Sequence, residues 1–243
     1  MAKKTKTQFV EAFKELLNSF QSYKEWIIFP LTQEYEDMTK KVNDCFYSHN
    51  WFYCVNVWDL KYIYDFIIEN EGKNNFKDLL DNFILRRSEK LLFCKENFIL
   101  YINYQKEKFG NILLELGENY FSGKYYSCVS LGLILINYLY NKIGGIDENK
   151  TEEFRKFISD KTKHLNKKGF FTYYNSKFDE LFKKTIYKNK INNKKDAENY
   201  TEDIVNRHKL FHGWDIDFGT QKNAINILLI IDFLLKFYER KIK

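Results

Sequence analysis

The chain has 243 residues, of which 44% are hydrophobic and 19% aromatic, so it is long and apolar enough to bury a core. It contains one proline and ten glycines, so the two residues that interrupt helices most strongly are scarce, and this favours an all-α protein. A net charge of +6 suits an anionic partner, but 30% of the residues are charged, with both signs present, and a lysine-rich soluble surface explains the excess equally well.

The cysteines and the N-terminus argue against zinc-binding, secreted and membrane proteins. No two of the four cysteines have C-x-x-C spacing and no histidine stands at zinc-finger spacing, so we expect reduced core cysteines, no metal site and no cofactor. The N-terminal residues lack a secretory apolar run, and the most apolar window, residues 129–140, is too short to span a bilayer. We therefore expect a cytoplasmic protein without a membrane segment.

Apolar residues recur every three or four positions along most of the first half of the chain, which is the period of helices with one buried face. Pro30 separates the first two of these helices. The fourth keeps its apolar stripe across a charged patch, and we expect a bend or break near Ser88, with Gly110 and Asn111 closing the segment. The predicted helices cover residues 7–29, 31–47, 51–69 and 76–108.

The second half has the same period and no strand pattern. Its last helix is apolar nearly all round between Ile225 and Tyr238, so we expect it to be the central member of a bundle. Thr220 suits the N-cap of this helix, with Asn223 placed to reach back to the cap, and Gly213 suits the C-cap of the helix before it. The other predicted helices cover residues 112–121, 125–143, 147–165, 178–186 and 197–212.

We place a boundary beside Gly110. Residues 1–108 are then an N-terminal helical region, and residues 109–243 are a C-terminal helical bundle. Both parts are expected to be all-α.

The segment from Asn206 to Gly213 holds two of the four histidines and one of the five arginines. An arginine and a histidine beside one phosphodiester suffice for metal-independent RNA cleavage, because guanidinium binds phosphate oxygens and imidazole transfers protons near neutral pH. The 2′-hydroxyl of RNA is the nucleophile, so DNA is not a substrate. On an ideal helix Arg207 and His212 lie about 140° apart. We therefore expect a composite site, formed either by unwinding near Gly213 or by a second subunit.

The surroundings of this pair resemble the C-terminal part of the HEPN superfamily, whose hallmark is an arginine, a polar residue, three variable residues and a histidine. Two segments carry the similarity, Asn206-Arg207-His208-x-x-x-His212-Gly213 and Phe218-Gly219-Thr220-x-x-Asn223, followed by an apolar terminal helix. The segment from Tyr120 to Cys128 is similar to the turn between the family's earlier paired helices. The resemblance covers about residues 110–240 and leaves residues 1–105 uncovered.

The resemblance implies a HEPN-like bundle that forms a homodimer with two motifs facing each other. It implies an endoribonuclease acting on RNA, of the bacterial toxin or phage-defence type, with an inhibitory or activating protein partner. Arg207 and His212 would be the catalytic pair, His208 the polar second residue of the motif, and Asn206 a residue that orders the helix end. One toxin branch has a modified tyrosine two residues after the motif histidine; Trp214 stands there, so that regulation is not expected.

Two other interpretations stay open. In one, a non-catalytic helical module uses the same groove to bind RNA, a nucleotide or a protein partner. In the other, the chain is a scaffold without a ligand, in which His208 and His212 only cap and pack. Separate packed environments for the motif side chains, with no shared cleft at any dimer interface, would favour the scaffold.

Overall fold

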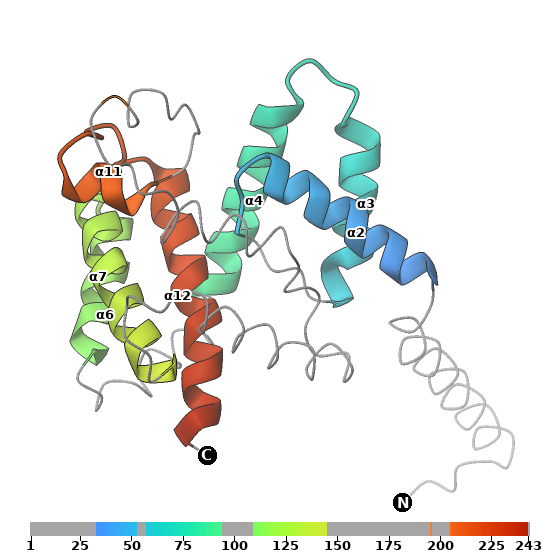
Figure 1. Cartoon of the computed structure of the whole chain (residues 1–243). Coiled ribbons are helices and arrows are strands. Elements are labelled where there is room, and N and C mark those ends of the chain that lie inside the picture. The colour runs from blue at the N-terminus through green and yellow to red at the C-terminus, as the bar shows by residue number, and fades with distance from the viewer. Residues whose placement is uncertain (1–32, 53–56, 94–108, 145–194, 196–204, 243) are drawn as a thin grey trace, which may run out of the picture.

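The computed structural model describes residues 33–52, 57–93, 109–144, 195 and 205–242 (Figure 1). These residues form helices and no strand, which confirms the all-α prediction. The helices are α2 (Gln33–Ser48), α3 (Val57–Asn70), α4 (Phe76–Phe93), α6 (Gly110–Phe121), α7 (Tyr125–Gly144), α11 (Arg207–Phe211) and α12 (Gln221–Ile242). The helices predicted over residues 7–29, 147–165 and 178–186 lie outside the described residues.

The last helix, α12, occupies the centre, as predicted. It packs along α7 on one side and against α4 on the other (Figure 1). Nearly all of its residues from 223 to 235 are buried. Contact with α7 is close because α7 has Gly132 here, where a Cβ atom would stand 2.2 Å from Cγ2 of Ile227. Helix α6 packs on α7, while α2 packs on α3 beyond α4.

One hydrophobic core runs from Tyr35 in α2 to Leu235 in α12. Buried apolar side chains from both sides of residue 108 belong to it, so α12 completes the core of the N-terminal helices as well as that of the C-terminal bundle. The boundary at that residue stays a prediction. None of the described helices is long and apolar enough to cross a membrane.

The turn after α2 differs from the prediction of a helix over residues 51–69. Trp51 and Phe52 are buried but not helical. The Trp51 amide donates to the Phe46 carbonyl (2.9 Å), and Asn50 has a φ of 60°, so these residues close α2 instead of opening α3. The apolar residues of this segment do have helical spacing. The Trp51 amide, however, is bonded to α2, so the next helix begins only at Val57.

Helix α4 is continuous through Ser88, so of the predicted bend or break the break is wrong. The part of the predicted helix after residue 93 lies outside the described residues. Ser88 is fully buried and continues a stripe formed by Leu80, Ile84 and Leu92, each four residues from the next. The charged residues around it lie on other faces of the same helix. A small hydroxyl side chain therefore faces the core without interrupting the helix.

The expected closure at Gly110 and Asn111 is also wrong, because α6 begins at Gly110. Phe109 is the residue before the helix and is 1% exposed, and its carbonyl accepts the Leu113 amide at 3.1 Å. A buried aromatic side chain thus anchors this end, where the sequence suggests only a glycine turn.

Candidate functional site

The motif lies on a helix of only five residues. The side chain of Asn206 is buried, and its Oδ1 accepts the Lys209 amide at 3.2 Å while its carbonyl accepts the Leu210 amide at 3.1 Å. Asn206 is therefore the N-cap of α11, which begins at Arg207. Val205 and Asn206 are not helical, so the continuous helix predicted over residues 197–212 is wrong. Asparagine competes for backbone hydrogen bonds and favours caps over helix interiors.

The other end of α11 closes as predicted. Gly213 has a φ of 67°, its amide donates to the Leu210 carbonyl (3.0 Å), and the Trp214 amide donates to the Lys209 carbonyl (2.8 Å). These two bonds form a Schellman motif, which needs a residue with positive φ and so favours glycine. His212 is consequently the C-cap, directly after Phe211, the last residue of the helix.

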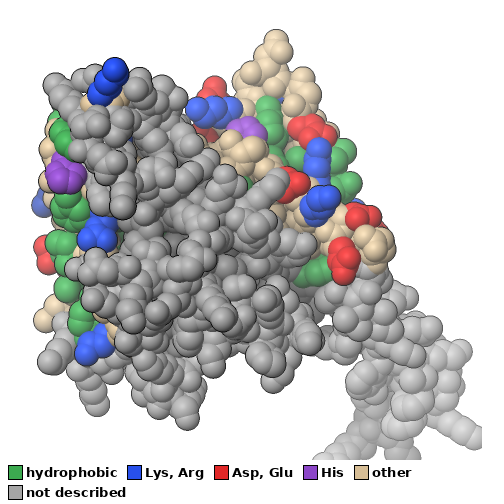
Figure 2. Space-filling model, viewed as in Figure 1, with side chains coloured by type: hydrophobic (Ala, Val, Ile, Leu, Met, Phe, Trp, Pro, Cys, Tyr) green, Lys and Arg blue, Asp and Glu red, His purple; other side chains and the backbone are tan. Residues whose placement is uncertain are grey.

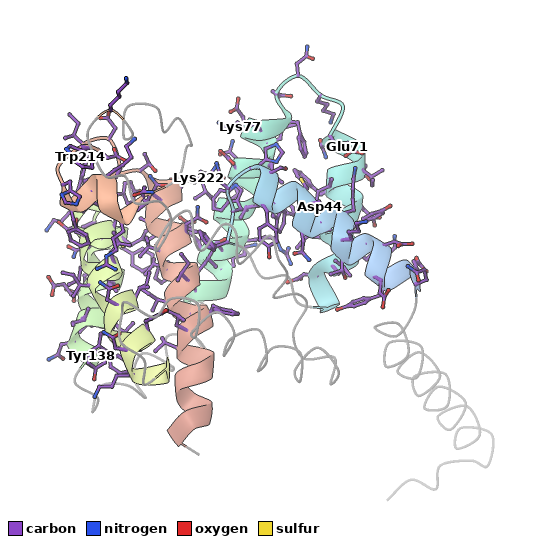
Figure 3. The ribbon with its side chains drawn as sticks, viewed as in Figure 1. Asp44, Glu71, Lys77, Tyr138, Trp214 and Lys222 are labelled. Atoms are coloured by element: carbon purple, nitrogen blue, oxygen red, sulfur yellow. The ribbon has the colours of Figure 1, made fainter. Side chains whose placement is uncertain are left out.

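The structure packs the two predicted catalytic side chains against different aromatic rings. The Arg207 guanidinium lies 5.7 Å from the ring centroid of Phe211, one helical turn later. The exposed His212 ring stacks on Trp214, with centroids 4.6 Å apart and planes at 22°. Figure 3 labels Trp214 beside α11. The role predicted for the His208 side chain lies outside what the structure describes.

The connection from α11 to α12 rests on the start of α7. Thr220 Oγ1 accepts the Asn223 amide at 3.1 Å, which confirms Thr220 as the N-cap. The Asn223 side chain donates to the Phe218 carbonyl instead of returning to the cap. Phe218 packs edge-on against Tyr126, and a Cβ atom at Gly219 would stand 2.3 Å from that same ring. This contact holds α11 at the end of the bundle where α6 turns into α7.

Large apolar side chains are exposed around this end. Phe121 and Tyr126 flank the α6–α7 turn and are 65% and 52% exposed, while Phe211 and Ile216 flank the end of α11 and are 52% and 72% exposed. We call these four residues the apolar end surface. Figure 2 shows hydrophobic side chains reaching the surface along the edge formed by α6 and α7. Exposed apolar residues gathered in one place are typical of an interaction site.

A second polar group, which the sequence does not reveal, lies between α12 and α4. Lys222 Nζ donates to Asp81 (3.1 Å) and to the His49 carbonyl (3.0 Å), and the Trp51 indole also donates to Asp81 at 2.7 Å. Lys222 lies on the side of α12 that faces α4 (Figure 3). Because these polar groups bond to one another, we interpret them as structural contacts that join α12, α4 and the turn after α2.

A third group joins α4, α6 and α12. Glu89 accepts hydrogen bonds from the Tyr120 hydroxyl and from the Gln221 amide (3.0 Å). Burial, followed by the hydrogen bond to Glu89, raises the pKa of Tyr120 well above its ordinary value. Gln221 and Glu89 are 132 residues apart, so no local signal could indicate this pair.

Within the described part of the chain, no three His, Cys, Asp or Glu side chains are placed to hold a metal ion. No protein-family model, no curated protein and no solved structure matches the chain. The resemblance to the HEPN superfamily therefore stays a prediction that rests on the motif and its surroundings.

Proposed function

We propose that the protein is a metal-independent endoribonuclease in which Arg207 and His212 form the catalytic pair, at a site shared by two copies of the chain. The observation that supports this proposal best is the capping of α11 at both ends. Asn206 fixes the start of the helix and Gly213 fixes its end, so Arg207 and His212 are held on one short element.

The chemistry needs only these side chains and the substrate. An imidazole takes the proton of the 2′-hydroxyl, the 2′-oxygen bonds to phosphorus, and the bond from phosphorus to the 5′-oxygen breaks. The imidazolium formed in this way gives the proton to the leaving 5′-oxygen, while the guanidinium holds the non-bridging phosphate oxygens. The products are a 2′,3′-cyclic phosphate and a 5′-hydroxyl. Arg207 of one copy and His212 of the other supply these two groups.

Because the two motif side chains lie against different rings within one chain, the proposal places the site between two copies. Arg207 lies against Phe211, whereas His212 stacks on Trp214. The apolar end surface adjoins the motif, and a homodimer related by two-fold symmetry would bury this same surface on both copies. Such a dimer would bring Arg207 of one copy toward His212 of the other.

The biological part of the proposal is a cytoplasmic role in phage defence or as a toxin, with a protein partner that inhibits or activates the enzyme. It is supported by the motif context alone. Growth arrest on expression of the wild type, and normal growth on expression of His212→Ala at equal protein level, is the expected result in cells.

The direct test uses purified protein and single-stranded RNA in EDTA. We expect cleavage that leaves cyclic phosphate ends, and a loss of at least about 100-fold in rate for Arg207→Ala and for His212→Ala. Lys124→Ala is the matched control, because it removes an exposed positive charge at the same end of the molecule. An RNA with a 2′-deoxy residue at the cleaved position should resist cleavage.

Equal cleavage by the wild type and both motif variants would overturn the proposal. Tight RNA binding by the wild type without any cleavage would instead indicate the non-catalytic binding module.

A further inference from the structure

A pocket of about 480 Å³ lies between α3 and α4. It is formed by the faces of α4 that do not enter the core. Asn82, Arg86 and Lys90 each follow a buried residue of the core stripe by two positions, which places them about 200° around the helix from it. The pocket is therefore separate from α11 and from the polar groups that join α4 to α12.

The floor of the pocket is aromatic. Phe66 of α3 and Phe83 of α4 stack with ring centroids 4.0 Å apart and planes at 11°. Tyr62, one turn before Phe66, adjoins this pair at 5.7 Å from Phe83 and is 58% exposed. The Arg87 guanidinium lies over one face of the exposed Tyr62 ring, so an aromatic ligand would stack on the opposite face.

Three cations stand at the pocket, and they have different roles. Arg87 is already engaged, because it forms an ion pair with Asp59 and lies 4.9 Å from the ring centroid of Tyr62. It therefore holds the tyrosine in place. Arg86 and Lys90 are exposed, and neither forms an ion pair with any residue that the structure describes. Their spacing of four residues places both on one edge of the pocket.

We infer that this pocket binds one nucleotide unit, with the base stacked on Tyr62 and the phosphate bound by Arg86 and Lys90. The volume lies in the range of small-ligand sites. Base stacking on an aromatic ring combined with phosphate contacts to nearby cations is the usual way in which proteins hold single nucleotides of a strand. Asn82, also at the pocket, has amide groups that can donate to and accept from a base edge.

The same chemistry suits a free nucleotide and a nucleotide within single-stranded RNA. The site goes beyond the proposed cleavage activity and does not depend on it, because no pocket residue belongs to α11. Binding at this pocket and cleavage at Arg207 and His212 can therefore fail separately.

The test measures binding by calorimetry with four probes: adenosine 5′-monophosphate, adenosine, inorganic phosphate and an RNA of six adenylates. We expect the monophosphate to bind more tightly than adenosine or phosphate alone. If the natural ligand is a free nucleotide, the RNA should bind no more tightly than the monophosphate. If the natural ligand is single-stranded RNA, the RNA should bind at least about tenfold more tightly.

Variants assign the binding to the pocket. Arg86→Ala, Lys90→Ala and Tyr62→Leu should each weaken monophosphate binding by roughly tenfold. Tyr62→Phe keeps the ring and should retain binding. Lys61→Ala is the charge control, since Lys61 pairs with Asp65 on the same helix and does not line the pocket.

All of these side chains are on the surface, and circular dichroism melting would verify that each variant folds. No measurable binding of any probe by the folded wild type would overturn the inference. Equal binding by the wild type, Arg86→Ala and Tyr62→Leu would overturn it too.

Discussion

At the scale of single residues, Asn226 links α12 to the turn after α2 through two hydrogen bonds. Its side chain is 3% exposed and faces the main chain of the turn after α2. The amide nitrogen donates to the Asn50 carbonyl (2.9 Å), and the amide oxygen accepts from the Phe52 N–H (3.1 Å). One side chain thus completes both hydrogen bonds that the turn cannot make within itself.

We expect Asn226→Ala to lower the free energy of unfolding by about 1–3 kcal/mol, because it leaves a partly buried carbonyl and a buried amide without partners. Urea unfolding followed by circular dichroism measures the change. Asn141→Ala is the control: Asn141 is exposed near the end of α7, and its loss should change stability by no more than about 0.5 kcal/mol. Similar losses in both variants would contradict the role given to Asn226.

Cys128 supplies a prediction that depends on pH. The thiol is fully buried at the start of α7, and burial raises its pKa to about 12 from an ordinary value of 9.0. Native protein at pH near 9 should therefore resist alkylation of Cys128 by iodoacetamide, and unfolding in urea should expose it. Peptide mass spectrometry measures the labelled fraction. Rapid labelling of the folded protein would show that the thiol is accessible.

The raised pKa of Cys128 also determines how the free energy of unfolding changes with pH. Because the folded thiol keeps its proton while the unfolded thiol releases it, the free energy of unfolding should fall as pH rises from about 9 towards 12. Below pH 9 both states hold the proton, so this group gives no pH dependence there. A Cys128→Ala variant should show a shallower alkaline decline in urea midpoint than the wild type. An equal decline in the two proteins would contradict this assignment.

At the scale of helices, two glycines with different surroundings give a paired prediction. Gly132→Ala places a methyl group 2.2 Å from Ile227 Cγ2 and should force α7 and α12 apart, at a cost of about 1–3 kcal/mol. Gly117 of α6 has open space at the same position, so Gly117→Ala should stabilise the protein by about 0.5–1 kcal/mol through helix propensity. Thermal melting of the two variants tests this difference, and a stabilising Gly132→Ala would contradict the close packing.

The helices and two caps could be predicted because they depend on neighbours in the sequence. Gly213 and Thr220 act within a few positions, and the apolar period of the last helix reports its burial on all sides. The start of α11 could not be found in that way, since Asn206 suits both a helix end and a helix start. Ser88 misled for a similar reason: its polarity suggests a break, but its small size suits the core.

Contacts between distant segments could not be predicted from the same patterns. Lys222 and Asp81 are 141 residues apart, and their pairing depends on how α12 lies against α4. The α3–α4 pocket is hidden for the same reason, because the stack of Phe66 on Phe83 requires two helices to meet. For the candidate site, the sequence supplies Arg207 and His212 as a prediction, but it does not indicate the separate aromatic rings against which the two side chains lie.

At the scale of the whole molecule, the proposed homodimer predicts that the apolar end surface is buried between two copies. The double variant Phe121→Asp with Ile216→Asp should therefore be monomeric by light scattering at concentrations where the wild type is dimeric. Tyr62→Asp with Ile68→Asp is the matched control, because these side chains are also exposed, at 58% and 47%, but lie on α3. Equal molecular mass for the wild type and both double variants would place the interface elsewhere.

A shared site also predicts complementation between inactive variants. When Arg207→Ala and His212→Ala chains are co-expressed, each mixed dimer has one site with both catalytic residues and one site with neither. Random pairing then restores about a quarter of the wild-type rate. A site contained within one chain predicts no recovery, and mixed dimers without activity would exclude the shared arrangement.

The hydrogen bonds between Asn226 and the turn after α2 can form only after most of the chain has been synthesised. Its two partners lie 174 and 176 residues earlier in the chain. At ribosomal speeds of about 5–20 residues per second, the turn waits roughly 10–35 s for α12 to be made. During that interval the apolar faces of the N-terminal helices have no α12 to cover them. We therefore expect the nascent chain to depend on chaperones, and slow codons before α12 should lower the yield of folded protein.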